Sequence, residues 1–167
     1  DPPVGAYFAE VVMPRTYGFG TAFYDIQNIQ VLKGVQGTLF GRNMTGGAVL
    51  AEPNHPDLHE FSASVVGQYG HYNMVDLTGV VNLPIIKDTL ALRVDGKYRD
   101  RAGFTTEVST GLDLDVQHYS AFRGSLEFQS GNLTSFTVFD YLKEEENGTA
   151  LKLVGYSLTD PRNGNPT

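Results

Sequence analysis

The stretch LALRVDGKYR at residues 90–99 decides the fold, because it alternates between apolar or small side chains and charged or polar ones. Leu90, Leu92 and Val94 occupy one phase of the alternation, whereas Arg93 and Asp95 occupy the other. A period of two places successive side chains on opposite faces of a β-strand. One face of the predicted strand is therefore apolar and the other is strongly charged.

Segments on both sides of this stretch repeat the pattern, and short turn-like sequences such as GHYN and QSGN separate them. Consecutive strands with such connections form an antiparallel meander. The alternation of the last segment does not decide which of its faces is which. We predict sequential antiparallel strands at about residues 60–70, 73–84, 89–99, 118–130 and 133–143, with one long connection between residues 100 and 117.

A meander of this kind fits a soluble sheet with one wet face or a transmembrane barrel, because both show the same alternation. Several tyrosines fall at one end of the predicted strands, which is typical of a membrane barrel's aromatic girdle but also occurs in soluble sheets. The charged face suits a wet lumen. We therefore expect Leu77, Val81, Leu92 and Val94 to point outward, and Asp76, Arg93, Asp95 and Lys97 to point inward. The tyrosines are Tyr69, Tyr72, Tyr98, Tyr119 and Tyr141.

Composition excludes several classes of protein. The sequence has no apolar run near the ~18 residues that a membrane-spanning helix needs. It has no cysteine, and its four histidines, His55, His59, His71 and His118, form no metal-ligand pattern, so we expect neither a metal nor a cofactor. The net charge of −7 argues against a nucleic-acid partner. Neither end carries a signal segment or a closing element, so we expect a fragment.

Residues 26–51 read IQNIQVLKGVQGTLFGRNMTGGAVLA and are rich in glycine. A phosphate-binding loop would need Gly-Lys-Ser/Thr after its second glycine, and a dinucleotide site would need Gly-x-Gly-x-x-Gly; neither is present. No nucleophile and base or paired carboxylates stand out, so we do not expect an enzyme. The glycines indicate tight turns or close backbone approach.

The phrase VLKGVQGTLFGRNMTGGAV resembles the signature near the end of the plug domain of TonB-dependent outer-membrane receptors. The resemblance extends outward, since DPPVGAYFAEV is similar to the preceding plug strand and TLALRVDGKYRDRAGFTT is similar to an early barrel strand. Three positions depart from the family pattern: Gln30 replaces an acidic residue, Val35 a proline and Leu50 an asparagine. Gln30 is neutral, so it cannot make the charge pair with the barrel wall that an acidic residue at this position could make.

The resemblance implies a mainly β fold, a fragment of a plugged barrel of roughly 22 antiparallel strands with part of its mixed α/β plug. Residues 1–53 would be the C-terminal part of the plug, and residues 54–167 would contain the first five or so barrel strands. The function implied is energy-coupled uptake of a scarce solute, such as siderophore-bound iron, cobalamin or an oligosaccharide, across the bacterial outer membrane. The implied partners are TonB with its inner-membrane energising complex, outer-membrane lipid and the solute.

The family places an apex loop between two plug strands, and here that loop is residues 15–19. Arg15, Thr16 and Tyr17 are therefore candidate substrate contacts, although a solvated turn is an equally good interpretation. Arg42 is expected to be a buried cation that holds the plug against acidic groups of the barrel wall, in preference to an exposed turn residue. The glycines expected to shape the plug, some with positive φ, are Gly34, Gly37, Gly41, Gly46 and Gly47.

Two other classes of protein remain as alternatives. A non-transporting binding or adhesion module could share the alternating strands. A passive porin would share the barrel but would not carry a glycine-rich domain before its first strand. Acidic side chains in the later loops could bind a cation, but such loops are more often simply solvated. They are Asp113, Asp115, Glu144, Glu145 and Glu146.

Overall fold

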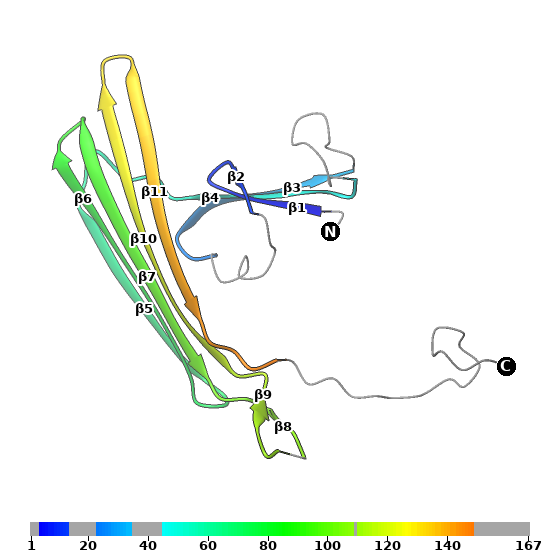
Figure 1. The fold of residues 1–167 in the computed structure, drawn as a ribbon. Coiled ribbons are helices and arrows are strands. Elements are labelled where there is room, and N and C mark those ends of the chain that lie inside the picture. The colour runs from blue at the N-terminus through cyan, green and yellow to red at the C-terminus, as the bar shows by residue number, and fades with distance from the viewer. Residues whose placement is uncertain (1–3, 14–22, 35–44, 109, 149–167) are drawn as a thin grey trace.

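The computed structural model describes residues 4–13, 23–34, 45–108 and 110–148, which form two main sheets (Figure 1). We call the four strands nearest the N-terminus the N-terminal sheet and the five long strands that follow it the wall. The described residues include strands and turns, with no helix that could cross a membrane.

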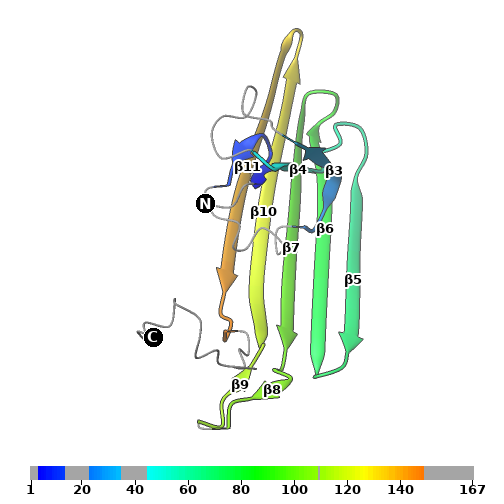
Figure 2. The same ribbon diagram turned by 90° about the vertical axis from the view of Figure 1, so that its right-hand side faces the viewer.

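The wall is a five-stranded antiparallel meander in which each strand pairs with the next along the chain. This order and the approximate bounds confirm the strand prediction. Figure 2 shows the five strands side by side in chain order. The strands are β5 (Ser62–Gly70), β6 (Met74–Ile86), β7 (Leu90–Arg101), β10 (Gln117–Ser130) and β11 (Leu133–Glu144).

The two faces of the wall differ as the alternation predicted. Leu77 and Val81 lie on the outer face and are 46% and 36% exposed, whereas Asp76 and Asp95 lie on the inner face and are 4% and 1% exposed. Cross-strand pairing extends each face, since Leu92 is opposite Leu83 and Leu126. The inner face meets the N-terminal sheet, and the predicted facing of these residues is confirmed.

Pairing with β10 also assigns the faces of β11. Asp140 lies opposite the inner residue Arg123, whereas Phe139 and Tyr141 belong to the outer face. Tyr119 is an exception to the predicted row of outer tyrosines, because it is on the same face as Arg123 and only 4% exposed. The prediction used only its place at a strand end. Its phase in the alternation of β10, the same as that of Arg123, puts its side chain on the inner face.

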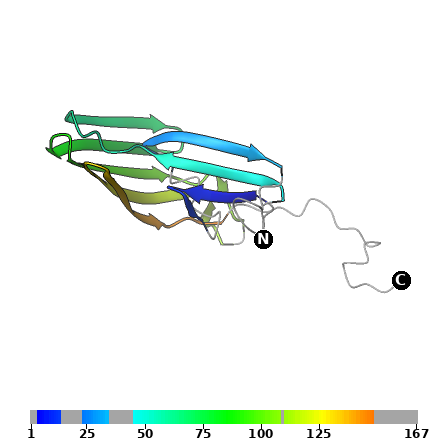
Figure 3. The same cartoon turned by 90° about the horizontal axis from the view of Figure 1, so that it is seen from above.

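The N-terminal sheet has the order β2-β1-β4-β3, and Figure 3 shows β1, β4 and β3 next to one another. β1 and β4 are parallel, while β3 is antiparallel to β4. Tyr7 and Ala48 form its small core, with Leu32 and Leu50 packed against them. The expected mixed α/β plug therefore shows only strands in its described part. The strands are β1 (Val4–Phe8), β2 (Val11–Val12), β3 (Ile26–Lys33) and β4 (Gly47–Pro53).

The long connection between β7 and β10 contains a small hairpin of β8 (Thr105–Thr106) and β9 (Asp113–Leu114). It lies at the same end of the wall as the β5–β6 turn, which is the lower end in Figure 1. We call this the loop end. Arg101 extends a guanidinium over the Phe104 ring at 5.3 Å, and Tyr72 lies 5.8 Å from the same ring. These contacts join the turn and the long connection.

Two of the predicted glycines have positive φ, as expected: Gly34 at +86° and Gly47 at +146°. They differ in their surroundings. A Cβ atom at Gly34 would meet nothing within 4 Å, whereas a Cβ atom at Gly47 would collide with the carbonyl oxygen of Leu32. Gly47 therefore permits both an unusual backbone conformation and a close approach of β4 to β3.

Replacing Gly47 with alanine should lower the free energy of unfolding of the N-terminal sheet by about 2 kcal/mol, because backbone strain and the collision act together. Gly34→Ala is the matched control, since it introduces strain alone and should cost about 1 kcal/mol. Thermal unfolding of both variants of the full-length protein in detergent measures the difference. Equal losses would contradict the steric role assigned to Gly47.

Candidate functional site

The candidate site is the interface between the N-terminal sheet and the inner face of the wall. Its first component is a pair between Asp25, just before β3, and Arg93 of β7. Two nitrogens of Arg93 contact the two carboxylate oxygens of Asp25, at 2.5 and 2.6 Å. The Asp25 side chain is 6% exposed and that of Arg93 is 15% exposed. This bidentate geometry fixes both position and orientation of the two partners.

The segment after β4 also holds Asp25. The side-chain amide of Asn54 donates to Asp25 Oδ1 at 2.8 Å, and the Asn54 backbone N–H donates to the Asp25 carbonyl at 3.0 Å. Asp25 itself has φ of +49°, a conformation that Asp adopts more readily than most residues. The Asn54 hydrogen bonds and the backbone conformation of Asp25 therefore help to orient the carboxylate toward Arg93.

The second component is Arg123 of β10, whose residue is 1% exposed. Its guanidinium lies 4.5 Å from the ring centres of both Phe8 and Tyr24. Nε donates to Asp140 at 2.8 Å, and Nη1 donates to the Tyr24 carbonyl at 2.9 Å. Nη1 also lies 3.5 Å from a carboxylate oxygen of Asp95. A planar guanidinium suits this combination of ring faces and acceptors.

Formal charge at this interface is unbalanced. Asp25, Asp95 and Asp140 supply three carboxylates, while Arg93 and Arg123 supply two guanidinium groups. Neither oxygen of Asp95 accepts a hydrogen bond from any described residue. The formal charges of these five side chains therefore sum to −1.

Tyr24 contributes a ring and a backbone carbonyl, not a charge. Burial raises the pKa of its phenol, and the nearby Arg123 opposes that rise less strongly. The phenol therefore stays protonated near neutral pH. A neutral ring next to a guanidinium keeps the favourable cation–π contact and adds no charge to the interface.

The link from β4 to β5 is fastened to the wall by Asn82, a fully buried residue of β6. Its side-chain oxygen accepts from the backbone N–H of Asp57 at 2.8 Å. Its side-chain nitrogen donates to the carbonyls of Asp57 at 3.0 Å and Glu60 at 2.7 Å. The Asn82 amide therefore provides hydrogen-bond partners for backbone groups of the linker, as a neighbouring strand would.

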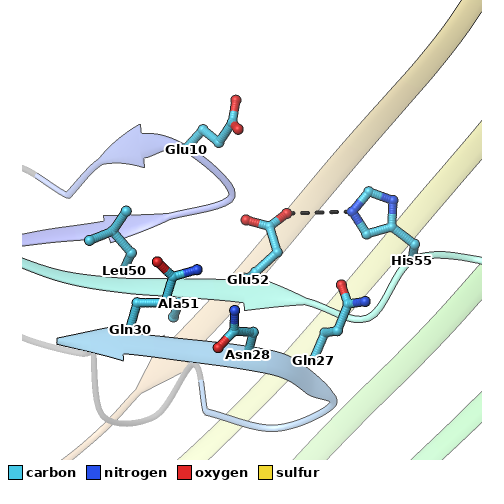
Figure 4. A pocket seen from close by; sticks show the side chains of 8 residues that line it. All are labelled: Glu10, Gln27, Asn28, Gln30, Leu50, Ala51, Glu52 and His55. Atoms are coloured by element: carbon cyan, nitrogen blue, oxygen red, sulfur yellow. Dashed lines mark ion pairs between the residues drawn. The ribbon is translucent and has the colours of Figure 1, made fainter. Parts of the chain in front are cut away.

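A polar cavity of about 660 Å³ lies beside β3, β4 and the linker. Figure 4 shows Gln30, Asn28 and Glu52 directed to the same side of these strands. His55 closes one end, 3.5 Å from Glu52 and 3.1 Å from Glu127, with its ring stacked 3.9 Å from that of Phe136. Gln30 thus faces an open polar space and has no charge partner from the wall in the described part of the chain. The remaining lining residues are Glu10, Gln27, Leu50 and Ala51.

A separate charge network lies nearer the loop end. Asp76 pairs with Arg99 and lies 3.5 Å from Lys97, while Arg99 extends over the Tyr119 ring at 5.9 Å. At the end of β11, Lys143 lies 2.9 Å from Glu145, which follows the strand, and lowers the pKa of that carboxyl. Burial and the neighbouring Glu144 raise the pKa of Glu146. The described residues contain no group of three potential ligands that could hold a metal ion.

Several predicted site residues lie outside the described residues: Arg15, Thr16, Tyr17, Gly37, Gly41 and Arg42. Of the others, Gly34 donates a backbone hydrogen bond to the Gly46 carbonyl at 3.2 Å, which brings together the two ends of residues 35–45. Gly47 then begins β4. The functional roles of all these residues remain predictions.

Sequence reasoning placed Arg93 and Asp95 on the inner face but did not find their surroundings. Phe8, Tyr24 and Asp25 come from a part of the chain without an extended periodic pattern. One signal was available for a partner, because an inner face that carries arginines needs acids or aromatic rings opposite it. That signal indicates the kind of partner but not its position in the sequence.

No protein-family model matches the chain. Three solved structures share its fold. FyuA, the ferric yersiniabactin uptake receptor of Yersinia pestis, matches with a TM-score of 0.71 and 22% identity over 78% of this chain and 20% of its own. FpvA, the pyoverdine receptor of Pseudomonas aeruginosa PAO1, solved with pyoverdine bound, has a TM-score of 0.66 and 19% identity, covering 83% and 20%.

The siderophore receptor PirA of Acinetobacter baumannii has a TM-score of 0.61 and 16% identity, covering 84% of this chain and 23% of its own. The chain thus spans about a fifth of the length of the first two structures that it matches. At these identities the likeness establishes the fold. The two sheets have the fold of part of each of these structures.

Proposed function

We propose that this chain is the end of the plug and the first five barrel strands of a TonB-dependent outer-membrane receptor that imports a metal chelate. The observation that carries the proposal is the attachment of a separate N-terminal sheet to the charged inner face of a meander, through Asp25–Arg93 and Arg123. A passive porin has no need for such a sheet. The shared fold with three outer-membrane receptors supports the same conclusion.

The division proposed is plug for residues 1–53 and barrel for residues 54–167. The hydrogen bonds of Asn82 to Asp57 and Glu60 support this division, because they attach the chain to the wall shortly after residue 53. Closure of a barrel of roughly 22 strands needs many more strands than these five. The apolar outer face would contact outer-membrane lipid, and the charged inner face would line the lumen around the plug.

Among scarce solutes, a ferric siderophore is the first choice, ahead of cobalamin and oligosaccharides. The three structures of the same fold are named for yersiniabactin, pyoverdine and siderophore, which supports this order. Arg15, Thr16 and Tyr17 would contact the chelate from the plug. An arginine and hydroxyl groups suit the oxygen-rich, often anionic surface of such chelates.

The proposed mechanism couples two sides of the plug. Chelate bound at the loop end would change what the plug presents to TonB, and TonB with its energising complex would then pull a path open. In this chain the residues that would resist movement are Asp25, held by Arg93, and the linker, held by Asn82. They would keep the end of the plug attached to the wall while other parts move.

Uptake by cells that express the full-length protein tests this proposal. Ferric yersiniabactin and ferric pyoverdine labelled with radioactive iron serve as probes, with cobalamin and a maltose oligosaccharide for comparison. We expect saturable uptake of a chelate that disappears when TonB is deleted. TonB-independent passage of all probes would favour a porin, and recovery of the protein outside the membrane fraction would favour a binding or adhesion module.

A further inference from the structure

His55 lies where the chain passes from β4 to the wall, and its ring contacts three strands. Nδ1 is 3.1 Å from Glu127 Oε2 of β10, and Nε2 is 3.5 Å from Glu52 Oε1 of β4. The ring is stacked on Phe136 of β11, with the ring centres 3.9 Å apart. Figure 4 shows His55 and Glu52 facing each other beside the polar cavity. We call these four residues the clasp.

The imidazole is the only group of the described chain that forms an ion pair with either carboxylate. Glu52 and Glu127 each pair with His55 and with no other described residue. From β11 the ring meets Phe136, which carries no charge. The cavity beside the ring is lined by a further acid, Glu10, and by no lysine or arginine among its described residues. The charge that faces the two carboxylates is therefore that of His55.

The number of protons on the ring decides how many carboxylates it can bind. An ionised carboxylate accepts hydrogen bonds and donates none, and a neutral imidazole has one N–H and one lone pair. A neutral ring that donates from Nδ1 to Glu127 therefore turns a lone pair toward Glu52. The imidazolium has an N–H on both sides, and its charge also strengthens the stack on Phe136. Both sides of the clasp are satisfied only when the ring carries two protons.

The clasp is open to solvent protons and weak enough to be reversible. The side chains of His55 and Glu52 are 41% and 33% exposed, and water reduces the strength of such pairs. Glu127 lies near the β10–β11 turn, at the end of the wall opposite the loop end (Figure 1). Short turns of a bacterial outer-membrane barrel lie on the periplasmic side. In the proposed receptor the clasp therefore lies toward the periplasm.

We propose that His55 is a pH-dependent clasp that fixes the angle between β4 and the wall. With two protons the ring joins Glu52 to Glu127. With one proton it can donate to only one of them, and β4 gains freedom to move relative to the wall. The inference rests on the fold and not on the identity of the solute. It goes beyond the proposed function by making the attachment of the plug's last strand sensitive to periplasmic pH.

The direction of the effect follows from the proton count. Histidine side chains change charge between about pH 5 and 8, so the closed clasp is favoured toward the acidic end of this range. The closed form holds one proton more than the open form. Its population relative to the open form should therefore fall by up to about tenfold for each unit of rising pH.

A double spin-label experiment on the full-length protein in detergent measures the angle without any solute. The 167-residue sequence has no cysteine, so labels can be placed at Val31→Cys of β3 and Thr137→Cys of β11, both exposed, once any cysteines elsewhere are replaced. Val31 is six residues beyond Asp25, which is bound to the wall, so a change of angle displaces it. Pulsed electron resonance should give a narrow distance distribution at about pH 5 and a broader one at about pH 8.

Three variants separate the clasp from a general effect of pH. Glu52→Gln supplies an amide that can donate to the lone pair of a neutral ring, so its distribution should stay narrow at about pH 8. His55→Gln removes the titrating ring and should give the same distribution at both pH values. The matched control is His59→Gln, because His59 pairs with Asp88 of the β6–β7 turn at 2.7 Å and not with the N-terminal sheet. It should keep the wild-type response.

The outcomes decide the proposal in either direction. A wild-type distribution that does not change with pH would overturn it, as would a response that survives in His55→Gln. If His55→Gln does not fold, Glu52→Gln decides, since broadening of its distribution at alkaline pH contradicts the proton count. Loss of the response in His59→Gln would overturn the assignment to His55. Because no solute is present, these results are independent of the uptake assay that tests the proposed function.

Discussion

Replacing Arg93 with alanine in the full-length protein should lower the free energy of unfolding of the N-terminal sheet by about 3 to 5 kcal/mol, the usual cost of leaving a buried charge without its partner. The Asp25 carboxylate is 6% exposed, and among the described residues it would keep only the amide of Asn54 as a side-chain donor. Differential scanning calorimetry in detergent, with the N-terminal sheet monitored separately from the wall, measures the loss.

Two comparisons show whether the loss belongs to the orphaned carboxylate. In Lys97→Ala the partner Asp76 keeps Arg99, so the cost should stay below about 1 kcal/mol. In the double variant Asp25→Asn, Arg93→Gln no charge is orphaned, and much of the stability should return. A double variant as unstable as Arg93→Ala would contradict this explanation, as would equal losses in Arg93→Ala and Lys97→Ala.

Replacing Leu92 with arginine should destabilise the folded, membrane-inserted protein by about 2 to 4 kcal/mol, because the charge would face hydrocarbon near the middle of the membrane. Leu92 lies on the outer face between the apolar neighbours Leu83 and Leu126. On this face of β7 the apolar positions run from Leu90 to Tyr98. Reversible folding into phospholipid vesicles, titrated with guanidinium chloride, gives the change in free energy.

Tyr98→Arg is the matched control, since it lies on the same face of the same strand but near the loop end. There the cost should fall to about 1 kcal/mol or less, because the side chain reaches the membrane interface. Equal effects at Leu92 and Tyr98 would mean that the outer face meets water along its whole length. That result would remove the membrane interpretation of the wall while leaving its strand order intact.

The wall could be predicted closely because its information is local. Each strand carries its own alternation, and pairing between neighbours along the chain needs only short turns. The N-terminal sheet could not be predicted in the same way. Its central pairing joins Val4–Phe8 to Gly47–Pro53 in parallel, and no feature within either short segment specifies the other.

The site was predictable to the same extent. The alternation placed Arg93 and Asp95 on the inner face. The pairing of strands within a sheet, however, does not identify the residues that pack against that face. Tyr24 and Asp25 reach these residues from a non-repeating segment, so their positions depend on tertiary packing alone. Tyr119 is a second case in which one sequence feature was insufficient. Its place at a strand end suggested a lipid-facing ring, whereas its phase in the alternation places the ring on the inner face.

The parallel pairing of β1 with β4 also sets an order of assembly. β3 and β4 are antiparallel and their facing ends are joined through Gly34 and Gly46, so they can form a hairpin from nearby sequence. β1 must wait until β4 exists, because closing the longer loop costs more entropy before any hydrogen bond forms. β1, together with β2, which pairs only with β1, is thus the last part to join the β3–β4 pair. By the same reasoning its amide hydrogens should exchange with solvent before those of β4.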